Sequence, residues 1–501
     1  MPEPIRPNYE QIYLFPPVLE DWIPAEHPAR FVRDFVASLD LVALGFAALQ
    51  HPTGRPPFDP GLLLALWLYG YLERIRSSRQ LERACYSHLG MIWLSGHLHP
   101  DHNTLSNFLR DHRAAFGRLF KQLVQVAAHL ELVGLLVHAL DGTKIAAACS
   151  KRGAWHRENL EKTLALLEET IEHLLAQTAQ ADAEETGEAA LPPALAEATA
   201  RRAKIQEALQ ALTDAQTDHL QAREPEARMM KGGDGRTLLS YNAQAVVDAT
   251  TGLVVAADVV TDAADNALLP PMLDQVAANI GATAEVSLAD GGYQSGEAFA
   301  HLEEQGRTVL VNLEPQTERA PSAYTKEHFT WQPDANQYVC PQGHVLPWVK
   351  LKTKKRKRDG TPYRVDLYQC RACADCPVRG DCTTSKTGRA VERTEYDEAF
   401  TRQRQQQREP DARFLLTWRG SIIERLFGQV KQGDGFRRWT VAGLEAVRAQ
   451  WALVCTTVNL RIFYRWWRDG RLSLTAWRET LRELVRAETR AQVMLGAPSG
   501  Q

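Results

Sequence analysis

Apolar residues recur at helical spacing through the N-terminal part of the chain. Pro60 opens a long apolar run that predicts a helix with a wide buried face. A second helix is predicted after the cap signal at Ser77, and a third begins near Asp101 or Asn103, both of which suit an N-cap. Residues 1–130 are therefore predicted to form a helical domain.

The middle of the chain shows strand-like patterns between helical ones. Residues 241–248 and 253–260 are rich in valine and alanine and flank a short turn, which predicts a β-hairpin. A helix is predicted near residues 268–280, and Asp262 or Asp265 is expected to cap it. Because strands alternate with helices here, the pattern predicts an α/β sheet.

Two segments interrupt this α/β pattern. Residues 157–226 are rich in Glu, Ala, Gln and Leu, and breaks at Gly187 and at 191–193 predict an antiparallel helical hairpin. The acidity of this hairpin argues against phosphate contact and leaves dimerisation or a lid as hypotheses. Residues 320–395 contain most of the cysteines and are predicted to form a small, zinc-ribbon-like insert.

The predicted organisation follows from these patterns. An N-terminal helical domain precedes an α/β domain in three parts, which the acidic insert and the Cys-rich insert separate. The last part also contains C-terminal helices, whose tryptophans are predicted to pack in the core. The segments in chain order are 1–130, 131–156, 157–226, 227–319, 320–395 and 396–490.

The composition is that of a soluble globular protein. Of the 501 residues, 44% are hydrophobic and 24% are charged, which is ordinary for globular domains. No apolar run reaches the roughly 18 residues that a membrane span requires. The N-terminal residues lack the charged-then-apolar pattern of a secretory signal. A cytoplasmic location is therefore expected.

The net charge hides a strong separation of charge along the chain. The total is −3, although the predicted hairpin is acidic and other segments are basic. Residues 352–358 include six cations, which indicates either a solvated loop or a DNA contact. A second basic group surrounds a helix predicted at 421–431 and favours phosphate binding through a local patch. Its members are Arg402, Arg404, Arg408, Arg413, Arg419, Arg425, Lys431, Arg437 and Arg438.

Three carboxylates far apart in the sequence are the main candidates for chemistry. Asp141 follows the apolar run 135–140, and Asp290 follows the segment Ala284-Glu-Val-Ser-Leu-Ala289. Both are read as strand ends, whereas Glu424 lies in the predicted helix. Two strand ends and one helix face can together hold a pair of hard divalent cations, which makes phosphodiester chemistry on nucleic acid the leading hypothesis. The alternative is that each aspartate only forms a turn or caps a helix.

The clustered cysteines suggest a second kind of metal site. Close cysteine pairs in a cytosolic protein favour thiolate metal ligands over disulfides. A tetrahedral Zn²⁺ site needs four nitrogen or sulfur ligands. The predicted set is Cys340, Cys373, Cys376 and Cys382, with Cys370 and His344 as alternatives. A reduced Cys-rich loop without metal is the other interpretation.

Four motifs carry a resemblance that extends from about residue 8 to about residue 468. They are Asp141-Gly-Thr-Lys144, Tyr241-Asn-Ala-Gln244, Asp290-Gly-Gly-Tyr293 and Ile423-Glu-Arg-Leu-Phe-Gly-Gln-Val-Lys431. Through these motifs the chain resembles bacterial insertion-sequence transposases of the DDE type. The similarity is to the branch that has a cysteine-rich insert before the catalytic Glu.

The resemblance implies an RNase H-like catalytic domain that uses Mg²⁺ or Mn²⁺. It places the catalytic, metal-binding triad on Asp141, Asp290 and Glu424. It also implies that Lys431 contacts transposon-end DNA. Lys431 lies seven residues after Glu424, which is two helical turns, so both side chains are expected to project from one helix face. The further DNA-contact candidates are Lys144, Arg419, Arg425, Arg437 and Arg438.

One position departs from the family pattern. Gly420 stands where the family often has an Arg four residues before the Glu, and Arg419 is the nearest substitute. This departure weakens a role for Arg419 but does not affect the carboxylates.

The expected partners are transposon-end DNA and target DNA. The N-terminal helices are expected to read the transposon end, and a homodimer is expected because two ends must be paired. The predicted activity is cleavage at the ends followed by joining of the 3′-hydroxyl to target DNA. A catalytically silent, transposase-derived DNA-binding regulator is the alternative from another functional class. A metal-dependent nuclease that cuts without joining is a third hypothesis.

Overall fold

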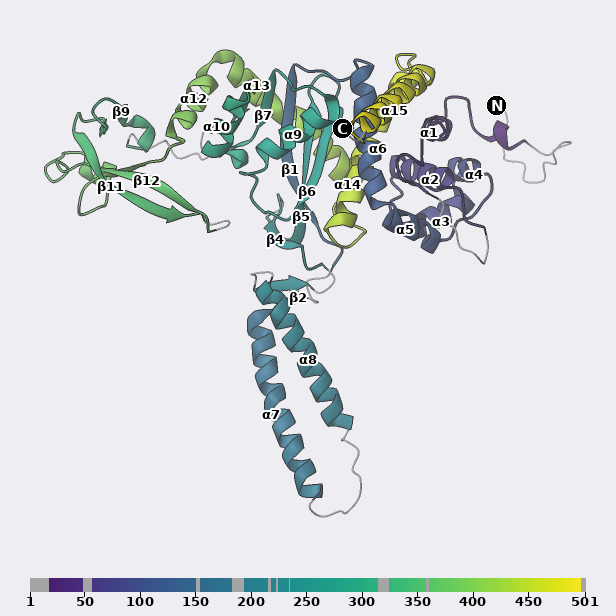
Figure 1. The fold of residues 1–501 in the computed structure, drawn as a ribbon, viewed down its shortest axis with the longest axis horizontal. Helices are drawn as coiled ribbons and strands as arrows, with labels where there is room; N and C mark the ends of the chain where they lie inside the picture. Colours follow the sequence, from purple (N-terminus) through teal and green to yellow (C-terminus); the bar gives the residue numbers. More distant parts are fainter. Residues whose placement is uncertain are drawn as a thin grey trace, which may run out of the picture. The chain divides into compact units, whose positions relative to one another are not determined.

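The structure is a computed structural model in which the chain divides into two compact units. Unit 1 consists of Met1–Asp265, Pro271–Ala284 and Ser421–Gln501, and unit 2 consists of Asn266–Pro270 and Glu285–Gly420. Figure 1 shows the helices and strands of both units. The residues described are 18–47, 56–149, 154–182, 193–214, 218–221, 224–233, 235–313, 324–356 and 360–496.

The N-terminal part of unit 1 is helical, as the apolar pattern predicts. Asp59, Ser77 and Asp101 cap the second, third and fifth helices through backbone N–H groups at 2.9, 3.3 and 2.7 Å. The second helix is buried on almost every side, since it lies within this helical group. The elements are η1 (Leu19–Trp22), α1 (Pro28–Val36), α2 (Pro60–Leu72), α3 (Ser78–Ser87), α4 (Leu89–Ser95), α5 (His102–Asp111) and α6 (Arg113–His129).

The sheet of unit 1 is antiparallel and centred on a long strand, β5 (Thr237–Asp248). β1 (Val137–Ala146) pairs with one edge of β5, while β4 (Arg228–Lys231) and β6 (Val254–Val260) pair with it at separate positions. The pairing of β5 with β6 confirms the hairpin predicted from the sequence. Because every residue of β5 from Ser240 onward is buried, this strand forms the centre of the unit.

The C-terminal helix α14 (Leu444–Arg468) joins the sheet to the N-terminal helices. It packs against α6, α2 and β6. The buried amide of Asn459 donates to the carbonyl of Val254 and accepts from its N–H, each at 2.8 Å. Gln450 donates to the hydroxyl of Tyr71 in α2 at 2.7 Å. These contacts hold together three layers of unit 1: the N-terminal helices, α14 and the sheet. The other helices of this part are α9 (Leu269–Ile280) and α15 (Leu474–Gly496).

A helical hairpin interrupts the sheet of unit 1, as predicted. α7 (Arg157–Asp182) packs against α8 (Pro193–Asp214), and Ile171, Leu195 and Ala198 form its small core. The short strands β2 (Ala154–His156) and β3 (His219–Gln221) pair at its base. Gly187 and residues 191–192, two of the expected break points, lie outside the described residues.

Unit 2 contains two separate groups of strands. β7 (Val286–Ala289) and β8 (Val309–Val311) are parallel, and a five-stranded antiparallel sheet has the order β13-β12-β11-β10-β9. Its strands are β9 (Thr330–Gln332), β10 (Gln337–Val339), β11 (Val345–Lys355), β12 (Pro362–Gln369) and β13 (Ala390–Arg393). The helical elements are η3 (Gly291–Tyr293), α10 (Gly296–Glu304), η4 (Lys326–His328), α11 (Arg379–Cys382) and α12 (Asp397–Arg408).

The mixed α/β class predicted from the sequence is confirmed. The chain passes from unit 2 back to unit 1 within α13 (Pro410–Gly428), and a π-helical turn, η5 (Gln429–Gly433), follows. None of the helices described is long and apolar enough to cross a membrane.

We predict that the Asn459→Ala variant lowers the free energy of unfolding by about 2–4 kcal/mol. The substitution leaves both buried backbone groups of Val254 without a partner, and each unpaired group costs about 1–3 kcal/mol. The measurement is urea unfolding followed by circular dichroism. Asn159→Ala, on the exposed surface of α7, is the control and is expected to shift stability by no more than about 0.5 kcal/mol. Equal stability of the two variants would contradict this role of Asn459.

Candidate functional site

Asp141 lies within a strand rather than at the end of one. β1 continues for five residues beyond it, and Asp141 is opposite Ala245 of the central strand. The strand end predicted at Asp141 is therefore wrong, because residues 142–146 keep pairing with β5. Its half-buried carboxylate accepts a hydrogen bond from the N–H of Gly142 at 2.7 Å. The central sheet thus holds the backbone of Asp141 in a fixed position.

A polar network occupies the other face of the same two strands. The register places Gly142 opposite Gln244 and Lys144 opposite Asn242. The carboxylate of Asp265 accepts from Lys144 at 3.0 and 3.1 Å, from Asn242 at 2.6 Å and from Gln244 at 2.9 Å. The Lys144 and Asp265 side chains are only 16% and 19% exposed, so this ion pair is well shielded from water.

This network explains two of the sequence motifs. A Cβ atom at Gly142 would lie 2.1 Å from the side-chain nitrogen of Gln244, so a larger residue would displace that amide from the network. Asn242 and Gln244 also bond to each other at 2.9 Å. The Asp-Gly-Thr-Lys and Tyr-Asn-Ala-Gln motifs are therefore the two sides of one buried hydrogen-bonded cluster.

Asp262 and Asp265 do not cap the helix that follows them. α9 begins at Leu269, and Asp265 instead accepts the three donors of the network. Asp262 contributes its backbone carbonyl, which accepts from Asn242 at 3.0 Å. The capping prediction was wrong because the donors to Asp265 come from two strands of the sheet. One of them, Lys144, lies 121 residues earlier in the chain, and local sequence does not reveal such a contact.

Glu224 is a buried carboxylate that sequence reasoning missed. It accepts from the hydroxyl of Tyr241 at 2.7 Å, from the N–H of Gly443 at 2.9 Å and from the N–H of Ala148 at 3.2 Å. Burial and the adjacent Glu224 carboxylate raise the pKa of Tyr241. Glu224 thereby ties the residues after β1 to the start of α14, and nothing in its local sequence signals this role.

Glu424 lies on the solvent-facing side of α13. Its neighbours Ile423 and Leu426 are buried and anchor the helix, while Glu424 and Arg425 are exposed. The expected α-helix does not continue through Lys431, because a π-helical turn spans Gln429–Gly433. Lys431 therefore does not stand two regular α-helical turns after Glu424. Single π-helical turns are rare and occur often at functional sites.

The segment after this turn is bound to the end of β1. The N–H of Trp439 donates to the carbonyl of Ala146 at 2.9 Å, and Arg438 forms a parallel bridge with Ala146. The Arg438 guanidinium donates to the carbonyls of Ala147 at 2.9 Å and Cys149 at 2.7 Å. The strand that carries Asp141 and the segment that follows the Glu424 helix are thus joined within unit 1.

The basic candidates differ in their surroundings. Arg425 and Arg437 are exposed, and Arg437 donates to the carbonyl of Lys431 at 3.2 Å. Lys431 and Arg419 are half-buried, and Arg419 belongs to unit 2. Because the Lys144 ammonium and the Arg438 guanidinium are held by groups of the chain itself, these two cations contribute to the architecture of unit 1.

Asp290 lies in unit 2, directly after β7. It is the N-cap of η3, where its carboxylate accepts from the N–H of Gly292 at 2.9 Å. A Cβ at Gly291 would lie 2.7 Å from the backbone oxygen of Asn312, so the first glycine of Asp-Gly-Gly-Tyr allows a close backbone approach. This segment therefore holds Asp290 in a tight turn at the end of a parallel strand.

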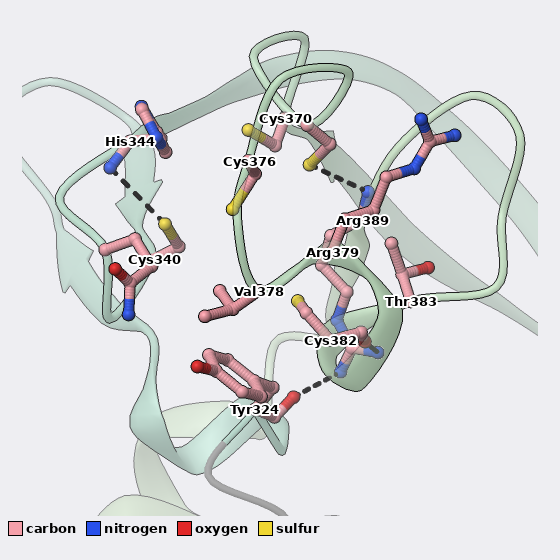
Figure 2. Close-up of a pocket in the computed structure, with 12 residues that line it drawn as sticks. Tyr324, Cys340, His344, Cys370, Cys376, Val378, Arg379, Cys382, Thr383 and Arg389 are labelled. Carbon is pink, nitrogen blue, oxygen red and sulfur yellow. Dashed lines mark hydrogen bonds between the residues drawn. The ribbon is translucent and has the colours of Figure 1, made fainter.

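The clustered cysteines line one pocket in unit 2 (Figure 2). Cys340 accepts from the N–H of His344 at 3.3 Å, and Cys373 accepts from the N–H of Arg389 at 3.4 Å. Burial raises the pKa of Cys370 to about 11, with a contribution from the thiol of Cys373. The donor residues on the pocket wall are Cys340, His344, Cys370, Cys373, Cys376 and Cys382.

No ready-made metal site is present in the described part of the chain. There, no group of three or more His, Cys, Asp or Glu side chains is arranged to hold a metal ion. Asp141 and Glu424 belong to unit 1 and Asp290 to unit 2. The chemistry of the donors nevertheless suits two kinds of ion: carboxylate oxygens suit Mg²⁺ and thiolates suit Zn²⁺.

We predict that the Asp265→Ala variant destabilises unit 1 by about 2–4 kcal/mol. The variant removes the carboxylate that accepts from the shielded Lys144 ammonium and one acceptor from each of two side-chain amides. Urea unfolding measures the effect. Asp262→Ala is the matched control, since that exposed residue uses only its backbone carbonyl in the network. If the two variants unfold at the same urea concentration, the Asp265 network does not stabilise the sheet.

Two family models match separate stretches of the chain. A transposase DDE domain matches residues 339–463, and a transposase domain (DUF772) matches residues 17–111. The first stretch contains Glu424, Lys431 and the clustered cysteines, whereas Asp141 and Asp290 lie outside both.

A comparison with solved structures gives a piggyBac transposase synaptic complex with hairpin DNA. The two chains are 10% identical, and the match covers 95% of this chain and 83% of the other. Its TM-score of 0.31 is too low to support an argument about the fold. No curated protein matches the chain. The two family models, which match the helical N-terminal region and the region around Glu424, support a DDE transposase.

Proposed function

We propose that the chain is an insertion-sequence DNA transposase that cuts transposon ends and joins the freed 3′-hydroxyl to target DNA. The observation that carries the proposal is the match of two transposase models to separate stretches, one of which includes Glu424. Asp141 supports it, because this carboxylate stands in a rigid strand that is linked to the segment after the Glu424 helix. We propose an RNase H-like catalytic domain for these elements.

We assign the catalytic metal ligands to Asp141, Asp290 and Glu424. Their oxygen donors fit Mg²⁺ or Mn²⁺, which prefer carboxylates and retain part of their water shell. When bound, a pair of such ions would activate the attacking hydroxyl or water and stabilise the leaving 3′-oxygen.

The side chains of unit 1 supply the remaining requirements. The Gly142 N–H orients one oxygen of Asp141, and the Asp265 network keeps β1 in register beneath it. Glu424 is on an exposed helix surface, where a DNA strand can approach it without displacing the core. Arg425 and Arg437 are exposed cations of unit 1 and are assigned to phosphate contacts.

The other cations receive separate assignments. We propose that Lys431 and Arg419 also contact DNA, Lys431 from the π-helical turn and Arg419 from α13. Lys144 and Arg438 act as positioning residues, since their charged groups bond to Asp265 and to backbone carbonyls.

The proposed substrates are transposon-end DNA and target DNA in the cytoplasm. A homodimer is proposed because the two ends of a transposon must be brought together before joining.

We predict that Asp290→Asn reduces cleavage and joining by about a thousandfold or more. Loss of a metal ligand removes several kcal/mol of transition-state stabilisation, and each 1.4 kcal/mol is about tenfold in rate. The assay incubates a duplex carrying the sequence that flanks the gene with protein and Mg²⁺. Glu424→Gln and Asp141→Asn are expected to behave alike, while Asp334→Asn, an exposed aspartate of unit 2, should retain activity.

Other outcomes of this assay separate the rival functions. Tight binding without cutting, equal for wild type and Asp290→Asn, would identify a DNA-binding regulator. Metal-dependent cutting without joined products would identify a nuclease. Full activity of all three carboxylate variants would overturn the assigned triad.

We also propose a structural zinc site in unit 2. The thiolates assigned to it are those of Cys340, Cys373, Cys376 and Cys382, with Cys370 and His344 as alternatives. All six residues line one pocket, which supports the proposal, although binding would have to draw four of the donors closer together. The ion would then cross-link β10, the loop after β12 and α11.

We predict about one zinc per chain in protein purified without chelators, measured by inductively coupled plasma mass spectrometry. The Cys373→Ser/Cys376→Ser double variant should lose it, because fewer than four ligands of the preferred set remain. Cys149→Ser, at a half-buried cysteine of unit 1, is the control and should retain zinc. Zinc-free wild-type protein, together with no uptake of added Zn²⁺, would reject the site.

A further inference from the structure

We propose that the two-stranded ribbon formed by β11 and β12 is a DNA-binding arm whose outer face enters the major groove of duplex DNA. This inference rests on the proposed function, which supplies duplex DNA as the substrate. It goes further by assigning DNA contact to residues of unit 2 other than the proposed metal ligands and the arginines named above.

The ribbon has the dimensions that such a role requires. Beyond the irregularity between Trp348 and Lys350, residues 351–355 of β11 pair only with residues 362–366 of β12. β13 pairs with β12 only from Asp366 onward. The end of the ribbon is therefore two strands wide, and the major groove of B-form DNA admits a two-stranded β-ribbon.

The inner face of the ribbon is already occupied by the chain itself. Lys352 is opposite Val365, and Lys354 is opposite Tyr363, so these side chains share one face. The Glu392 carboxylate pairs with both lysines, at 3.7 Å from Lys352 and by a direct hydrogen bond from Lys354. Val365 is only 2% exposed. On this face, Glu392 thus engages both lysines, and Val365 packs into the core of unit 2.

The outer face carries exposed apolar and cationic groups. Leu351 is opposite Asp366, Thr353 is opposite Arg364, and Lys355 is opposite Pro362, so these residues share the second face. Trp348 joins them, because its indole N–H donates to Asp366 at 2.7 Å. Trp348 and Leu351 are 46% and 49% exposed, and both Lys355 and Arg364 are exposed.

Charge favours DNA as the partner of this face. β11 and β12 together carry five Lys or Arg residues and one Asp, in a chain whose net charge is −3. Arginine and lysine bond to phosphates and to the guanine acceptors in the major groove, and apolar side chains contact thymine methyl groups. Exposed tryptophan and leucine between cations provide both kinds of contact on one surface.

Arg356, the residue directly after β11, lies near the segment that contains Asp290. Arg356 forms an ion pair with Glu297 at 2.7 Å, and Glu297 lies in the first turn of α10. α10 begins six residues after Asp290 within the same unit. Duplex DNA held by the ribbon would therefore lie close to the part of unit 2 that supplies one proposed metal ligand.

The test compares two double variants with the same change in charge. Lys355→Gln/Arg364→Gln alters the outer face, and Lys352→Gln/Lys354→Gln alters the inner face, whose lysines are bound to Glu392. Binding to a random-sequence 30-base-pair duplex is measured by fluorescence anisotropy between about 50 and 200 mM salt. Circular dichroism checks that each variant is folded.

The outer-face variant is expected to bind at least about tenfold more weakly at low salt. The slope of log affinity against log salt should fall by about 2, since two phosphate or base contacts are lost. The inner-face variant should retain the wild-type slope. Dimethyl sulfate probing should show protection of guanine N7, which lies in the major groove, by wild type but not by the outer-face variant.

The possible results separate this inference from the proposed function. If wild type binds and cuts DNA, and the outer-face variant matches it in affinity and slope, the ribbon is not a DNA-binding arm while the transposase proposal stands. Equal losses in the two double variants would show a general charge effect and would also overturn the inference. If wild type fails to bind duplex DNA at any salt concentration, both the arm and the transposase proposal fail.

Discussion

The Asp265 carboxylate is the constraint on which the sheet of unit 1 depends. Three donors from two neighbouring strands converge on it: the Lys144 ammonium and the amides of Asn242 and Gln244. A one-residue slip between β1 and β5 would turn every side chain to the opposite face and break all three bonds. The network therefore sets the register, and the register sets the position of Asp141 in the strand.

The same unit is held together by buried polar groups rather than by apolar packing alone. Glu224 joins the residues after β1 to the start of α14, and Asn459 joins α14 to β6. Each of these groups has its partners, so burial costs little and the contacts are specific. This arrangement fixes the position of β1, which carries Asp141, relative to the helices around it.

Unit 2 uses a different set of features. Its five-stranded sheet has a small core of aromatic residues and cysteines, including Tyr338, Tyr368 and Cys370. On one face of the ribbon Glu392 engages two lysines, whereas the other face exposes cations, Trp348 and Leu351. Such an asymmetry between two faces of a single ribbon is what a nucleic-acid contact would use.

The sequence by itself was sufficient for local structure and for the chemical type of the candidate residues. Periodicity predicted the N-terminal helices, the hairpin of β5 with β6 and the helical pair α7 and α8, because those patterns depend on neighbours in the chain. The spacing of Asp, Glu and Cys residues indicated carboxylate and thiolate sites. The residues before Asp290 predicted a strand that ends there. In the structure Asp290 directly follows β7 and is the N-cap of η3.

Only the tertiary structure decided which distant groups meet. Asp265 was expected to cap a helix, but its donors come from β1 and β5, and Glu224 showed no local signal of its three partners. The sequence also did not predict the π-helical turn at Lys431, because the apolar positions in this segment are equally compatible with a regular α-helix. Long-range hydrogen bonds and small changes in helical pitch follow from packing, which hydrophobic periodicity does not encode.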